Sequence, residues 1–229
     1  MSALKALFSN FLCALRDLLL NFLHEGVMMA GAEADPIARA VFYAVIGCWF
    51  IFFLTFGLRA RRPRIQETKR DRTAMAGLFV QAVGYFGVWF YPLQRKQFSA
   101  IVPMPRTAEI VLAVLTVALA AASVWLVDAA SRQLGKQWGL AARLVEGHDL
   151  ISDGPYRLVR NPIYAGMFGL LLATGLAMSR WTTLLAASAV FVAGTLIRIR
   201  SEEKLLRQAF GATFEEYARK VPALFPGIY

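Results

Sequence analysis

"IYAGMFGLLLATGLAMSRWTTLLAASAVFVAGTLI" (Ile163–Ile197) carries a single charge, Arg180. Arg180 separates two uncharged segments, and each is near the lower limit of the roughly 17–25 residues that span a bilayer as a helix. Because so little chain lies between the segments, we expect a tight helical hairpin whose tip is Ser179–Arg180–Trp181. A tryptophan at such a tip suits the aromatic belt at the membrane surface.

The rest of the chain is also rich in apolar residues. Of its 229 residues 58% are hydrophobic, against roughly 45–50% apolar residues in an average globular protein. Three more stretches are long enough to span a bilayer, namely Ile37–Leu58, Ala74–Pro92 and Ile110–Val127. The predicted fold class is therefore an all-α integral membrane protein with about five transmembrane helices, folded as a single domain.

The two ends of the chain have a different pattern. Apolar residues in the N-terminal segment, from Leu4 to Phe22, recur with helical spacing but are interrupted by charges. This pattern predicts an amphipathic helix at the membrane surface within residues 1–35, with a sixth span as the alternative, and does not fit a cleavable signal peptide. Near the other end, Ser201–Val221 is predicted to form a separate helix that Pro222 and Pro226 terminate.

The net charge of +10 is spread between the apolar stretches. This distribution indicates contact with anionic lipid headgroups and a role in topology, and we expect no nucleic-acid partner. The most basic loop, Arg59–Arg72, is predicted to be cytoplasmic, which also places Asp128–Pro162 and the chain after Arg198 on the cytoplasmic side. Cys13 and Cys48 lie in apolar segments, outside any Cys/His cluster, so neither a disulfide nor a metal site is predicted.

Polar residues crowd the stretch just before the hairpin, "ISDGPYRLVRNPIYAG" (Ile151–Gly166). Asp153–Pro155 predicts a turn, and Asn161–Pro162 predicts a helix start with Asn as the N-cap. The free N–H groups of that helix attract anions, and Arg157 and Arg160 add to this field. Taken singly, the arginines are better explained by contact with lipid phosphates; taken together with the charged residues after the hairpin, the stretch favours a functional site.

Charged residues also follow the hairpin. Arg198, Glu202 and Glu203 stand just after the last predicted span. The two glutamates can simply complement the dipole of a helix start. The functional alternative is that one of them holds a cation at the membrane edge, since polar groups at that depth tend to be functional.

Both charged stretches resemble one family. "GPYRLVRNPIYAG", the hairpin and then "RIRSEEKLLRQAFGATFEEYARKVPALFPG" are similar to the isoprenylcysteine carboxyl methyltransferase family, which belongs to a wider group that includes phospholipid methyltransferases. The preceding "RQLGKQW" and "LVEGHDLISDGPY" are similar too. The resemblance covers about Arg132–Gly227, whereas the first half of the chain matches only in being a set of spans.

The resemblance implies that S-adenosylmethionine binds beneath the hairpin on the cytoplasmic side, without a Rossmann domain. The chain indeed has no GxGxxG after a strand. The implied cofactor-binding residues are Gln137, His148, Gly154, Pro155, Tyr156, Arg160, Asn161, Pro162, Tyr164, Arg198, Glu202 and Glu203. The implied catalytic residues are Arg160, Glu203 and Lys220.

Two of these residues differ from the family pattern. Lys220 stands where the eukaryotic prenylcysteine enzymes have an arginine that helps hold the substrate carboxylate. Asn161 stands where the family most often has His, so capping or hydrogen bonding is expected there instead of an imidazole base. His148 would serve as a base only for a thiol or amine acceptor, and an exposed loop histidine is the alternative.

The predicted function is transfer of a methyl group from S-adenosylmethionine to a lipophilic small-molecule acceptor that enters from the membrane lipid. A prenylcysteine-type carboxylate, a phospholipid amine and a small thiol stay open as acceptors, and the sequence defines no oligomeric state. Residues 1–35 would be the amphipathic segment, 36–130 three spans, and 131–229 the cofactor-binding region.

Two alternatives belong to other classes of protein. The first is an NADPH-dependent membrane reductase of the sterol reductase type, which the Glu202–Glu203 pair disfavours because a nucleotide phosphate needs basic partners. The second is a non-enzymatic membrane protein with a structural hairpin, which would bind no cofactor and tolerate replacement of both glutamates.

Overall fold

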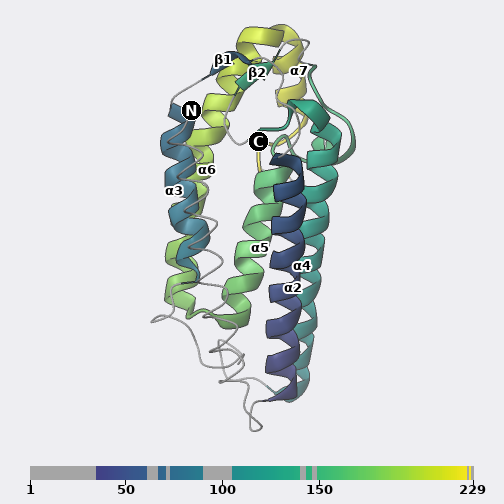
Figure 1. The fold of residues 1–229 in the computed structure, drawn as a ribbon, viewed down its shortest axis with the longest axis vertical. Coiled ribbons are helices and arrows are strands. Elements are labelled where there is room, and N and C mark those ends of the chain that lie inside the picture. The colour runs from purple at the N-terminus through teal and green to yellow at the C-terminus, as the bar shows by residue number, and fades with distance from the viewer. Residues whose placement is uncertain are drawn as a thin grey trace.

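The computed structural model is a helical bundle with a small pair of strands at one end (Figure 1). It describes residues 35–60, 67–70, 73–89, 105–139, 143–145, 149–225 and 227. The amphipathic helix predicted within residues 1–35 and most of the basic loop lie outside the described residues. Three described helices are long and apolar enough to cross a membrane, and two shorter apolar helices join them. The predicted all-α membrane fold with five hydrophobic helices is thus confirmed.

Two of the long helices lie side by side. Helix α2 (Pro36–Ala60) contains the first predicted span, and helix α4 (Arg106–Leu134) contains the third. Arg106 Nη2 donates to Asp35 Oδ1 at 2.7 Å, which joins the starts of the two helices. At 1.5 Å per residue α4 is about 43 Å long, so it extends beyond a hydrocarbon core of about 30 Å.

The predicted hairpin is present. Helix α5 (Pro162–Met178) and helix α6 (Trp181–Phe210) are separated by only Ser179 and Arg180. Ser179 Oγ donates to the carbonyl oxygen of Val88 at 2.7 Å, which ties the tip to the residue after helix α3 (Thr73–Gly87). The exposed ring of Trp181 lies at this tip, as predicted.

The prediction of a separate helix over Ser201–Val221 was wrong in its boundaries. Helix α6 runs without a break through the charged residues to Phe210, and Gly211, with φ of 49°, ends it and precedes the short helix α7 (Ala212–Lys220). A continuous helix of about 45 Å carries Arg198 and Glu203 past the apolar part while keeping them on a rigid element.

Glycines let the helices approach closely. Helix α3 packs along α6, where a Cβ on Gly84 would lie 2.3 Å from the backbone nitrogen of Phe191. Helix α4 packs along α5, where a Cβ on Gly166 would lie 2.8 Å from the carbonyl oxygen of Ser123. Small residues at such contacts are typical of membrane helices, which associate through close packing.

A two-stranded antiparallel sheet, which was not predicted, lies at the end of the bundle that carries α7 (Figure 1). Strand β1 (Glu67–Arg70) pairs with strand β2 (Arg143–Val145). The pair connects the chain after α2 to the chain after α4. This end of the bundle also holds the polar residues singled out in the sequence.

Candidate cofactor pocket

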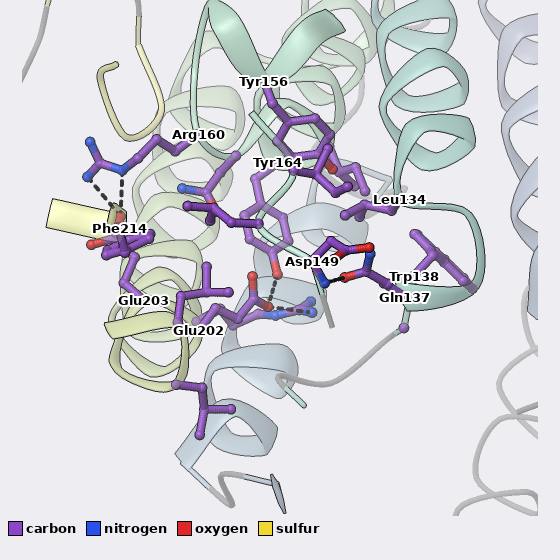
Figure 2. Close-up of a pocket in the computed structure, with 18 of the residues that line it drawn as sticks. Leu134, Gln137, Trp138, Asp149, Tyr156, Arg160, Tyr164, Glu202, Glu203 and Phe214 are labelled. Carbon is purple, nitrogen blue, oxygen red and sulfur yellow. Dashed lines mark hydrogen bonds and ion pairs between the residues drawn. The ribbon is translucent and has the colours of Figure 1, made fainter. Parts of the chain in front are cut away.

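A cavity of about 210 Å³ opens at the α7 end of the bundle, beneath the start of α5. In Figure 2, the polar side chains around it extend from α5, from α6 and from the chain that precedes α5. The polar residues that line it, besides its tyrosines, are Gln137, Asp149, Arg160, Asn161, Arg198, Glu202 and Glu203. Its aromatic walls are formed by Trp138, Tyr156, Tyr164, Phe214 and Tyr217, and its apolar side includes Phe56, Leu78, Ile163 and Met167.

Arg160 and Glu203 form a nearly buried ion pair on one side of the pocket (Figure 2). Arg160 Nε and Nη2 donate to Glu203 Oε1 at 3.0 and 2.8 Å. The second carboxylate oxygen of Glu203 accepts from Arg207 Nη2 at 3.1 Å. The Glu203 carboxylate therefore lies between two guanidinium groups, in keeping with the rule that buried charged side chains are paired.

Tyr164 and Glu202 meet in the centre of the pocket (Figure 2). The Tyr164 hydroxyl donates to Glu202 Oε1, and Arg198 Nη2 lies 3.7 Å from the same oxygen. The Arg198 guanidinium also lies over the Tyr164 ring, 4.8 Å from its centroid. Residues 38 positions apart are thus brought together because α5 and α6 are the two arms of one hairpin.

The C-terminal segment closes over the start of α5. The backbone N–H groups of Arg160 and Asn161 donate to the carbonyl oxygens of Pro222 and Ala223 at 2.8 and 3.1 Å. Arg160 Nη1 donates to the carbonyl oxygens of Ala218, at 2.8 Å, and Val221. The predicted helix start is confirmed, with Asn161 at the N-cap position of α5 and Pro162 as its first residue. Of the two roles expected for the Asn161 side chain, capping and hydrogen bonding, the structure shows the second: the side chain makes no capping bond, and Nδ2 donates to Ala223 O at 2.9 Å.

The predicted turn before α5 is present as the 3₁₀ helix η3 (Gly154–Arg157). Gly154 has φ of 60°, which an L-residue with a side chain rarely adopts. The turn buries Tyr156, whose backbone carbonyl accepts from the Tyr217 hydroxyl at 2.7 Å. Burial raises the pKa of Tyr156, with Glu202 and Tyr217 adding to the effect. Tyr156 therefore stays a neutral wall of the pocket.

Tyr217 links α7 to this turn. Burial, opposed by Arg160 and aided by Glu203, raises the pKa of Tyr217 to about 12. Its phenol is therefore protonated at neutral pH and can keep donating to the Tyr156 carbonyl. The Tyr217 hydroxyl thus connects α7 to the turn that carries Tyr156.

The structure brings most of the predicted site residues together. Eight line the pocket, namely Gln137, Tyr156, Arg160, Asn161, Tyr164, Arg198, Glu202 and Glu203. Gly154, Pro155 and Pro162 shape the adjoining backbone without lining it. Gln137 lies in the 3₁₀ helix η2 (Gly135–Gln137) and accepts from the Asp149 backbone N–H at 3.2 Å.

Two predicted residues are not placed at the pocket. His148 lies outside the described residues. Lys220 is exposed at the end of α7, where Nζ forms an ion pair with Glu216 Oε1 at 2.6 Å, and it does not line the cavity. A role for either residue therefore stays a prediction.

Sequence reasoning missed several pocket residues. Trp138, Phe214 and Tyr217 supply aromatic walls, and the spacing of Phe214 and Tyr217, three residues apart, places them on one face of α7. Gln81 lies outside the cavity lining but contacts Arg198 from α3. Its only sequence signal is an uncharged amide inside an otherwise apolar span, a place where polar groups tend to be functional.

The pocket combines paired charges with flat aromatic surfaces. Three carboxylates, of Asp149, Glu202 and Glu203, and two arginines can bind a ligand that carries both an ammonium and a carboxylate group. The aromatic walls can stack on a planar ring or contact a cation. These side chains fit an adenosine-containing, amino-acid-like ligand, which carries charges of both signs, better than a nucleotide phosphate, which would lie against the carboxylates of Glu202 and Glu203.

Residues 111–213 match the family model described as phospholipid methyltransferase. This segment contains α5, almost all of α4, η3 and α6, and the beginning of α7, so it includes most of the pocket. The resemblance to membrane methyltransferases is therefore confirmed over this segment. Phe56, Leu78 and Gln81 lie outside it.

Named relatives also match part of the chain. The protein-S-isoprenylcysteine O-methyltransferase of Schizosaccharomyces pombe is 34% identical over 38% of this chain and 37% of the relative. The probable protein-S-isoprenylcysteine O-methyltransferase of Oryza sativa subsp. indica is 38% identical over 35% of this chain and 42% of the relative. The nickel-cobalt-cadmium resistance protein NccN of Alcaligenes xylosoxydans xylosoxydans is 36% identical over 41% of this chain and 44% of the relative. The chain spans less than half the length of these curated relatives.

Proposed function

We propose that the protein is a membrane methyltransferase that uses S-adenosylmethionine and methylates a lipophilic acceptor. The observation that carries this proposal is the pocket in which charged residues of the matched segment adjoin an apolar side from the spans. A polar half suits a water-soluble cofactor, and an apolar half suits an acceptor that comes from the bilayer. We infer from the positive-inside rule that the pocket faces the cytoplasm.

Each pocket residue has a role in this proposal. Glu202 and Glu203 would hold the ammonium and sulfonium charges of the cofactor, and Arg198 its carboxylate. S-adenosylmethionine supplies an electrophilic methyl group on a sulfonium sulfur. The main task of the chain is then to orient the two reactants, because an in-line displacement depends on positioning more than on acid–base chemistry. The rigid hairpin, with Tyr164 bonded to Glu202, is suited to that task.

The acceptor is proposed from the apolar side of the pocket and from the relatives. Phe56, Leu78 and Met167 come from three different apolar helices. The hydrocarbon chain of a lipophilic acceptor that lay between these helices would reach the polar residues. The relatives' names point to a prenylcysteine carboxylate, which is already ionised at neutral pH and needs no base. Lys220 is proposed to assist by attracting that carboxylate from its exposed position.

Methyl transfer to defined acceptors tests this proposal. The full chain, in vesicles containing phosphatidylethanolamine, is supplied with methyl-labelled S-adenosylmethionine and a farnesylated cysteine. We expect label in an ester of the prenylcysteine, and Glu203→Gln should reduce the rate about tenfold or more, since a charge-assisted hydrogen bond contributes roughly 1.5–3 kcal/mol. Glu109→Gln, at the other end of α4, is the matched control and should keep the wild-type rate.

The outcomes separate the acceptors and the classes of protein. Label in phosphatidylethanolamine would replace the carboxylate acceptor with an amine while leaving the methyltransferase in place. Absence of label from every acceptor, together with NADPH-dependent reduction of a sterol, would favour the reductase alternative. Equal rates for Glu203→Gln and Glu109→Gln would contradict the proposed role of the pocket.

A further inference from the structure

Gln81 is a buried amide on α3 that bonds to two side chains of α6. Only 1% of its surface is exposed. Gln81 Oε1 accepts from Arg198 Nη1 at 2.7 Å, and Gln81 Nε2 donates to Thr195 Oγ1 at 2.7 Å. Because both polar ends of the amide are used, its orientation is fixed, and it presents an oxygen to Arg198.

Glycines on both helices shape the channel in which the Arg198 side chain lies. A Cβ on Gly77, one helical turn before Gln81, would lie 2.8 Å from Arg198 Cγ. A Cβ on Gly194 would lie 2.3 Å from the backbone nitrogen of Gln81. Gly77 therefore leaves space for the arginine stem, and Gly194 brings α3 close enough for Gln81 to reach its head group.

Arg198 connects Gln81 to the centre of the pocket. Its Nη1 binds Gln81, whereas its Nη2 lies 3.7 Å from Glu202 Oε1 and its guanidinium covers the Tyr164 ring. Because a guanidinium is planar and rigid, the bond at Nη1 together with the contact with the Tyr164 ring restricts where Nη2 can lie. The direction of Nη2 toward Glu202 is thus set from α3, outside the cavity.

We propose that Gln81 is a positioning residue for the pocket: it holds Arg198 in the orientation that places Glu202 and Tyr164 for cofactor binding. This inference rests on the proposed function. Gln81 lies outside the segment that matches the family model, so the match assigns it no role. Gln81 does not line the cavity and acts only through Arg198.

Calorimetric titration with S-adenosylmethionine tests the proposal on the full chain in detergent. Gln81→Met keeps the size of the side chain but removes the acceptor, and we expect about tenfold weaker binding, as for one lost charge-assisted hydrogen bond. Gln81→Glu keeps an acceptor oxygen and should bind within about threefold of wild type. If Gln81→Met does not fold, Gln81→Asn withdraws the acceptor by one methylene and should weaken binding by the same factor.

A matched control variant distinguishes a positioning role of Gln81 from a role in helix packing alone. Thr174→Val removes a buried hydrogen bond between two other helices, in which Trp49 Nε1 donates to Thr174 Oγ1 at 2.8 Å. It should lower the thermal unfolding temperature as Gln81→Met does, but leave binding within about twofold of wild type. The double variant Gln81→Met/Glu202→Gln should lose less affinity than the product of the two single losses, since both act on the same contact.

Each result has a distinct meaning. Wild-type protein that binds S-adenosylmethionine while Gln81→Met binds within twofold of it would overturn the inference alone. Multiplicative losses in the double variant would also overturn it, because Gln81 would then act independently of Glu202. No binding by the folded wild type would overturn the proposed function and this inference together.

Discussion

Asn161 donates its backbone N–H and its side-chain Nδ2 to the same acceptor, the carbonyl oxygen of Ala223, at 3.1 and 2.9 Å. These two bonds join the residue before α5 to the C-terminal segment, 62 positions away. Leu224, the next residue, is buried against Tyr164 and Ile199. The C-terminal segment therefore packs against residues that line the pocket, although it lies beyond the matched segment 111–213 and does not line the cavity itself.

Loss of the Asn161 amide should loosen that segment. Asn161→Ala keeps the backbone bond to Ala223 but removes the side-chain bond, which contributes about 0.5–1.5 kcal/mol. We expect faster amide hydrogen exchange at residues 221–224 and severalfold weaker binding of S-adenosylmethionine. Asn161→His keeps an N–H donor and should behave close to wild type. Unchanged exchange in Asn161→Ala would show that the backbone bonds alone hold the segment.

Arg160 should not be replaceable by lysine. Its guanidinium donates hydrogen bonds to Glu203 through Nε and Nη2, and to two backbone carbonyl oxygens through Nη1. A lysine ammonium cannot meet this planar arrangement, so Arg160→Lys should destabilise the protein by about 1–3 kcal/mol and weaken cofactor binding about tenfold. Thermal unfolding and calorimetry measure both effects. Arg157→Lys, three residues earlier and with a side chain that is 76% exposed, is the control and should change neither.

Close packing of α3 on α6 should make Gly84 sensitive to a single methyl group. A Cβ there would lie 2.3 Å from the backbone of Phe191, so Gly84→Ala should lower stability by about 1–3 kcal/mol. Gly47, on α2, faces open space, and a Cβ added there would meet no atom within 4 Å. Gly47→Ala should therefore be neutral or slightly stabilising, because alanine favours helices over glycine. Equal thermal unfolding of the two variants would contradict the close contact.

Alkaline titration should reveal the raised pKa of the Tyr217 phenol. Folding raises its pKa from 10.0 to about 12, so the folded state holds the proton more tightly than the unfolded state. The stabilising contribution is complete below pH 10 and is lost as the pH rises from 10 toward 12. The tyrosinate absorbance of the wild type minus that of Tyr217→Phe should show one transition near pH 12. A difference transition near the ordinary value of 10.0 would place the phenol in solvent.

The hairpin and the clustering of the pocket residues were predictable from the sequence. A single charge between two apolar segments left only a short connection, and that connection is Ser179–Arg180. The motif residues before and after the hairpin then had to meet, because antiparallel helices bring those ends together. Arg160 with Glu203 and Tyr164 with Glu202 follow from this topology.

Other features depend on contacts that the sequence does not encode locally. The charges from Arg198 to Glu203 suggested the end of a helix, but pairing with Gln81, Tyr164 and Arg160 satisfies them within continuous α6. Asn161 has the residue type of a helix cap, but its side-chain Nδ2 donates to the carbonyl oxygen of Ala223, which the local sequence does not indicate. Strands β1 and β2 are only four and three residues long, too short to show an alternating pattern.

Calorimetric titration of the detergent-purified full chain with S-adenosylmethionine tests the central claim most directly. Wild type and Glu109→Gln should bind saturably, with equal affinity, whereas Glu203→Gln and Tyr164→Ala should each bind about tenfold or more weakly. That result would place the cofactor among the paired charges beneath the hairpin. A folded, monodisperse wild type that binds no S-adenosylmethionine, or four proteins that bind it equally, would contradict the claim.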